Sequence, residues 1–118
     1  GGMAAAVCVE VAAALNREGL RAHTEGRIEE ALQYFLGAKK LQPSKPSYLL
    51  SAANMALKLG ENESAAELYR QVERVPMLSD EHRSMVARKL ARCDKRAGPS
   101  AATPASARAR ELLRQHLE

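Results

Sequence analysis

The stretch LNREGLRAHTEGRIEEALQYFLGAKKLQP, residues 15–43, decides the predicted fold of this chain. It holds two helical patterns separated by Gly26. Gly19 lies inside the first pattern, where glycine costs about 1 kcal/mol relative to alanine. We therefore expect a neighbouring helix to approach too closely there for a larger side chain. Gly26 lies where a helix end needs a positive φ, which is cheap only for glycine. The stretch predicts a hairpin of two helices.

The same pattern returns 34 residues later in the chain. The positions of Leu15, Gly19, Gly26, Ala31, Phe35 and Ala38 are taken, in that order, by Leu49, Ala53, Gly60, Ala65, Tyr69 and Val72. Each pair keeps its physical class, whether apolar, small, glycine or aromatic. Pro43 closes the first unit because proline cannot continue a helix interior. A fixed period of this length marks stacked helical hairpins.

These residues resemble the tetratricopeptide repeat, over about residues 12–77 of the chain. The second unit departs from the family at its end, where Met77 stands in place of the proline and Pro76 comes one residue early. The resemblance implies an all-α fold, a right-handed superhelix of two hairpins whose first helices line a concave groove. The alternative is an ordinary helical bundle whose period arose by chance.

The predicted domain covers residues 3–97, with repeats at about 12–45 and 46–79. A capping helix at about 80–97 begins where a third repeat would start, with Ser79 as its N-cap residue. The expected helix ranges are 4–24, 27–41, 46–59, 62–74 and 80–97. The sequence thus predicts five helices in one solenoid-like domain.

The residues after this domain fall into two parts. The stretch GPSAATPA, residues 98–105, is small and rich in proline, which is typical of a linker. Residues 106–118 resume a helical pattern with an apolar edge of Leu112, Leu113 and Leu117. An isolated helix of this length is only marginally stable in water. We therefore expect it to pack on a surface, either in the groove of its own chain or on a neighbouring molecule.

Composition limits the class of protein. The chain has 118 residues, 27% of them charged and 3% aromatic, with a net charge of +4. The sequence contains no run of 18 apolar residues, so it predicts no membrane-spanning helix. Cys8 and Cys93 lie far apart and suggest two reduced thiols, which favours a cytoplasmic or nuclear location. Gly1 and Gly2 look like a tag remnant, so Met3 is the expected natural start.

No catalytic constellation stands out in the sequence. His23, His82 and His116 are far apart, and neither a phosphate-binding glycine loop nor metal-ligand spacing occurs. We therefore predict that the protein is not an enzyme and needs no cofactor or metal.

The resemblance implies an adaptor or scaffold that binds a peptide or amphipathic helix of a partner protein in its groove. Family geometry places these residues there: Asn16, Leu20, His23, Leu50, Asn54, Leu57, Lys58, Arg88 and Arg92. Leu20, Leu50 and Leu57 would form an apolar floor. The amide of Asn54 would bind a peptide backbone, and the arginines would pair with carboxylates. The alternative interpretation is that these charged residues lie on a solvated helix face and bind no partner.

Two alternatives stay open. The helix at residues 106–118 would fill the groove of a second copy, which makes the protein a self-associating assembly module. Residues 83–96 carry six basic residues and one acid, which suggests contacts to RNA phosphates. No aromatic side chains interleave with these cations for base stacking, which weakens the RNA hypothesis.

Overall fold

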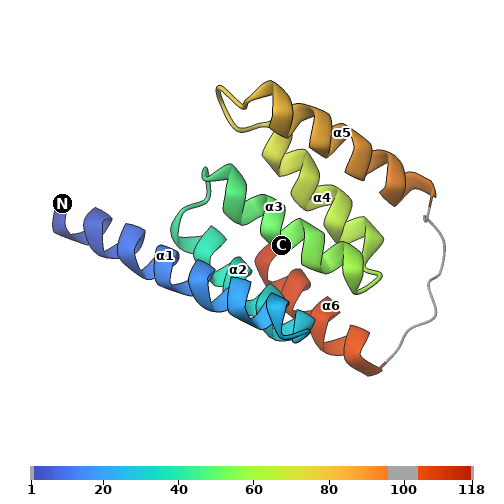
Figure 1. The fold of residues 1–118 in the computed structure, drawn as a ribbon, viewed down its shortest axis with the longest axis horizontal. Helices are drawn as coiled ribbons and strands as arrows, with labels where there is room; N and C mark the ends of the chain where they lie inside the picture. The colour runs from blue at the N-terminus through green and yellow to red at the C-terminus, as the bar shows by residue number, and fades with distance from the viewer. Residues whose placement is uncertain (1, 96–103, 118) are drawn as a thin grey trace.

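The structure is a computed structural model that describes residues 2–95 and 104–117, with side chains for residues 4–94 and 107–117. All regular secondary structure in these ranges is helical, which confirms the all-α class. The helices, drawn in Figure 1, are α1 (Gly2–Thr24), α2 (Ile28–Leu41), α3 (Pro46–Lys58), α4 (Asn62–Glu73), α5 (Asp80–Lys95) and α6 (Pro104–Leu117). None of the helices in these ranges is both long and apolar enough to cross a membrane.

The predicted helix bounds agree closely with those observed, with one correction. The predicted linker was 98–105, but residues 104 and 105 already belong to the first turn of α6. Proline suits that position because the first helical residue needs no amide donor. The predicted end of the fifth helix and the remainder of the linker lie outside the described residues. Ser79 is the N-cap of α5 as predicted, since its Oγ accepts a 3.1 Å hydrogen bond from the amide of His82.

The turns of the two hairpins have the same backbone conformation. Gly26 has φ +80° and Gly60 has φ +81°, which confirms the predicted positive φ at both. The amides of Gly26 and Arg27 donate to the carbonyls of His23 and Ala22, and those of Gly60 and Glu61 donate to Leu57 and Ala56. These bonds are the two that define a Schellman motif. Each residue of the second turn lies 34 positions after its counterpart, so the period of the sequence is also a period of the backbone.

Gly19 lies where α1 crosses α2. A Cβ atom built on Gly19 would lie 2.5 Å from Cε1 and 2.7 Å from Cδ1 of Phe35. Phe35 is only 1% exposed, so its ring has little room to move away. The close approach of a neighbouring helix that was expected at Gly19 is therefore confirmed, and the neighbour is the aromatic residue of the same hairpin.

The helices pack in sequence order. Each of α1 to α4 contacts the next helix along the chain, and α6 returns to contact α2 (Figure 1). The main core forms between these layers around Phe35, Leu49, Leu68 and Tyr69, all of them at most 1% exposed. The start of α1 extends past the other helices (Figure 1).

The C-terminal helix α6 packs against its own chain. Leu113 and Ala109 are fully buried in the main core, and Leu112 and Leu117 pack partly buried against it. The Nε of Arg110 lies 3.4 Å from Oε1 of Glu61, at the start of α4. The predicted apolar edge of Leu112, Leu113 and Leu117 therefore packs with α6 against α2, and not in the groove or on a neighbouring molecule.

Acidification is expected to loosen α6. Lys39 Nζ donates a 3.4 Å hydrogen bond to the carbonyl oxygen of His116. Burial lowers the pKa of His116 below its ordinary 6.5, and the nearby positive Lys39 and Lys40 lower it further. Well above pH 6.5 the imidazole is neutral whether α6 is docked or not, so protonation of His116 does not oppose docking in that range. As pH falls below 6.5, the undocked helix takes up the proton first, and docking weakens.

Hydrogen exchange of residues 104–117 at a series of pH values, down to about pH 5, measures this loss. The variant His116→Gln should remove the part of the pH dependence that belongs to this imidazole. An identical pH profile in wild type and variant would contradict the assignment.

Candidate functional site

A groove of about 620 Å³ opens between α1, α3 and α5. Its lining residues are Leu20 and His23 of α1, Phe35 of α2, Ser51, Asn54, Met55, Leu57 and Lys58 of α3, and Lys89 and Arg92 of α5. Among the residues with described side chains, none of α4 or α6 lines it. The two hairpins therefore leave an open hollow on the side formed by α1, α3 and α5.

The structure brings together most of the predicted groove residues. Those that line it are Leu20, His23, Asn54, Leu57, Lys58 and Arg92. Asn16, Leu50 and Arg88 do not line it. Leu50 and Leu57 are 6% and 4% exposed and both belong to the main core, but only Leu57 lines the groove, so the predicted floor of Leu20, Leu50 and Leu57 is wrong in its central member.

The reason for this correction lies in the packing of α3. Between Tyr48 and Leu57, every residue of the helix is buried except Ser51 and Asn54. Helix α3 contacts α2 on one side and α4 on the other, so only a narrow face remains open. That face carries the polar residues Ser47, Ser51, Asn54 and Lys58, at helical spacings of three and four. The groove surface of α3 is therefore polar rather than apolar.

Four lining residues were missed by the sequence analysis: Phe35, Ser51, Met55 and Lys89. Ser51 had a signal in the sequence, because it continues the polar spacing of Ser47, Asn54 and Lys58. Phe35 and Met55, which are 1% and 2% exposed, lie at the bottom of the groove and contribute little open surface. The choice of Lys89 over Arg88 depends on the rotation of α5 about its axis, which has no signal in the sequence.

Asn54 is held by the second hairpin. The hydroxyl of Tyr69 donates a hydrogen bond to Oδ1 of Asn54. Tyr69 is fully buried, and this burial raises the pKa of its hydroxyl, which keeps the proton available for donation. With Oδ1 occupied, the amide NH₂ of Asn54 is the part that remains to bind a ligand. Asn54 can therefore still donate hydrogen bonds from its side-chain NH₂ to a bound peptide, but its Oδ1 is already used as an acceptor.

The groove carries an excess of positive charge. Its positively charged residues are Lys58, Lys89 and Arg92, and its described lining includes no acidic side chain. Burial lowers the pKa of Lys89, and the positive charges of Arg92, Lys58 and Arg88 lower it further. The cations therefore lie close enough to repel one another without a compensating carboxylate. An anionic ligand would relieve this repulsion.

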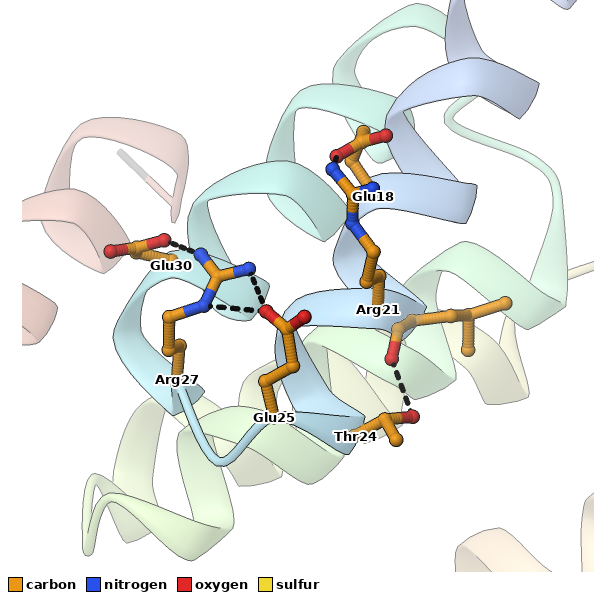
Figure 2. Close-up of polar contacts among 7 residues, drawn as sticks. Glu18, Arg21, Thr24, Glu25, Arg27 and Glu30 are labelled. Carbon is orange, nitrogen blue, oxygen red and sulfur yellow. Dashed lines mark hydrogen bonds and ion pairs between the residues drawn. The ribbon is translucent and has the colours of Figure 1, made fainter.

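Acidic residues at the turn between α1 and α2 already have partners. Figure 2 shows Arg27 bonded to both Glu25 and Glu30, and Arg21 paired with Glu18 at 2.7 Å. All five side chains are at least 40% exposed, so each pair contributes less than about 1 kcal/mol to stability. These carboxylates are neutralised locally by their arginines and do not compensate the cations of the groove.

The basic stretch at residues 83–96 does not present one face. The Nε of Arg83 donates to the carbonyl oxygen of Leu78 at 3.2 Å, whereas Lys89 and Arg92 line the groove. Arg88 is exposed outside the groove lining. The side chain of Lys95 and all of Arg96 lie outside the described residues. Only part of the predicted cluster is therefore joined in a single surface.

Within residues 2–95 and 104–117, no group of three or more His, Cys, Asp and Glu side chains is placed to hold a metal ion. Comparisons of the chain with protein-family models, with curated proteins and with solved structures found no match.

Proposed function

We propose that this protein is a tetratricopeptide-type adaptor that binds a peptide or amphipathic helix of a partner protein. The observation that carries the proposal is the open groove between α1, α3 and α5. In this proposal α1–α2 and α3–α4 are two repeats of a right-handed superhelix, and α5 is the capping helix. The identical turns at Gly26 and Gly60 support it, because repeated hairpins stack in a repeated way.

The function in this proposal is recognition without catalysis or a cofactor. Leu20 is 49% exposed at the edge of the groove and offers the largest accessible apolar surface there. Covering the exposed half of a leucine contributes roughly 1 kcal/mol to binding. The amide of Asn54 and the hydroxyl of Ser51 supply hydrogen bonds to a bound backbone. Recognition then depends on one apolar contact with a polar wall beside it.

A self-associating role for α6 is not favoured. Leu113 is fully buried against the chain's own core, so a second copy would have to displace an existing contact. The groove remains open with α6 docked, because none of the described side chains of α6, residues 107–117, is among its lining residues. Binding of a partner and docking of α6 are therefore compatible.

The variant Leu20→Asp tests the adaptor proposal. Leu50 is unsuitable because it is buried, and Asn54 because its loss would leave the Tyr69 hydroxyl without its partner. Leu20→Asp removes apolar surface at an exposed position, so the melting temperature should hardly change. Binding of a partner should weaken about tenfold, equivalent to roughly 1.4 kcal/mol.

Val9→Asp is the matched control for this experiment. Val9 lies on the same helix, is 50% exposed, and is not part of the groove. Affinity capture followed by mass spectrometry would identify partners of wild type, and titration would compare the two variants. If Leu20→Asp retains every partner at wild-type affinity, the groove is not the binding surface.

A further inference from the structure

The groove has two chemically different sides. Leu20 provides apolar surface on the side of α1, whereas Lys58, Lys89 and Arg92 provide positive charge on the side of α3 and α5. Lys89 and Arg92 are three residues apart, so they lie on the same side of α5, one helical turn from each other. A ligand that fits both sides must be apolar along one edge and anionic along the other.

The charges of the positive side are uncompensated within the described part of the chain. Lys58, Lys89 and Arg92 have no carboxylate among the residues that line the groove with them, and none of the three forms an ion pair there. At the neighbouring turn the acids Glu18 and Glu25 are paired with arginines. Charge complementarity therefore favours an occupant with negative charge.

We infer that the occupant of the groove is an acidic amphipathic segment of a partner protein. Its carboxylates pair with Lys58, Lys89 and Arg92, and an aliphatic side chain covers Leu20. The inference rests on the proposed function and adds the chemistry of the partner to it. Charge-assisted hydrogen bonds between ammonium or guanidinium groups and carboxylates are among the stronger polar contacts. The cations also steer an acidic segment toward the groove before contact.

A nucleic acid would satisfy the cations but not the other side of the groove. Binding of single strands depends on bases that stack on exposed aromatic side chains. Phe35 is the one aromatic residue among the described residues that line the groove, and it is 1% exposed. Leu20 has no counterpart in a phosphate backbone. An acidic protein segment therefore uses more of this surface than RNA does.

Selection from a random peptide library displayed on phage tests the inference without assuming a sequence. Wild-type protein should enrich segments that combine Asp or Glu with aliphatic residues. The double variant Lys89→Glu/Arg92→Glu should lose that acidic preference, because its groove wall carries negative charge. Circular dichroism before selection checks that the double variant keeps its helices.

Fluorescence anisotropy with one selected peptide, blocked at both ends, then gives the size of the effect. Replacement of its Asp and Glu by Asn and Gln should weaken binding about tenfold or more, and Lys89→Glu should do the same for the acidic peptide. Arg17→Glu is the matched control, since it makes the same charge change at an exposed α1 residue outside the groove. It should change affinity by no more than about twofold, because exposed charges are screened.

The outcomes separate the two proposals. If the enriched peptides are not acidic but their binding is lost in Leu20→Asp, the adaptor function stands and the acidic partner is wrong. If no peptide binds, or if Leu20→Asp and Lys89→Glu leave binding unchanged, both proposals fail. Single-stranded RNA that binds more tightly than the selected peptide, with a steep salt dependence, would overturn the assignment of a protein partner.

Discussion

Gly19→Ala is expected to lower the free energy of unfolding by about 1–3 kcal/mol, although alanine is normally the better helix former by about 1 kcal/mol. The added Cβ would lie 2.5 Å from Cε1 of Phe35, well inside van der Waals contact. The Phe35 ring is 1% exposed and cannot swing into solvent. Either α1 shifts away from α2 or the ring leaves its preferred rotamer. Urea unfolding followed by circular dichroism measures the loss.

A second-site change tests the mechanism of this loss. Phe35→Leu alone removes buried aromatic surface and should be destabilising, but in the Gly19→Ala background it also removes the clash. The two losses should therefore be less than additive, which a double-mutant cycle reveals.

Gly37→Ala is the contrasting control, since its Cβ would meet only the end of the flexible Leu15 side chain, with Cδ1 at 3.2 Å and Cδ2 at 4.0 Å. This variant should be close to neutral or stabilising. A Gly19→Ala protein as stable as wild type would show that α1 and α2 do not cross as closely as described.

Leu113→Asp should release α6 from α2. Leu113 is fully buried and packs in the main core. The substitution therefore removes about 3–5 kcal/mol of packing energy and places a carboxylate in an apolar environment. The remaining attachments are the partly buried Leu112 and Leu117 and two polar contacts of 3.4 Å. These are too weak to hold a carboxylate in the core. The helix is therefore expected to undock and, at this length, to lose much of its helicity.

Hydrogen exchange resolved by residue is the appropriate measurement for Leu113→Asp. Amides of residues 104–117 should exchange far faster than in wild type, whereas those of α3 and α4 should stay protected, because these helices pack on each other without α6. Ala107→Asp, at an exposed position of the same helix, should leave the exchange of α6 nearly unchanged. Wild-type protection of α6 in Leu113→Asp would contradict this description of its docking.

Much of the fold follows from local chemistry that the residues of each hairpin carry themselves. The positive φ at Gly26 and Gly60, the N-cap at Ser79 and the tight crossing at Gly19 all involve residue types with few alternatives. The turns at Gly26 and Gly60 repeat at the period of the sequence, so one hairpin predicts the next. The helix ranges could therefore be predicted closely.

The candidate site was harder to predict, because it depends on how each helix is rotated against its neighbours. Leu50 and Leu57 look alike in the sequence and both belong to the main core, yet only Leu57 also lines the groove. Arg88 and Lys89 are adjacent cations, and only Lys89 lines the groove. One residue of helix changes direction by about 100°, so a small rotation of α3 or α5 exchanges one side chain for another.

The residues of the chain alone thus account for six helical segments, two matched turns and a crossing at Gly19, since each arises from contacts within one hairpin or its backbone. The burial of Leu50 and the docking of Leu113 depend on packing beyond a single hairpin. Those contacts join residues far apart in the chain, and their geometry exists only once neighbouring helices have packed. That is why the groove and part of its positive side were predictable, whereas the exclusion of Leu50 and the choice of Lys89 over Arg88 depended on the packing.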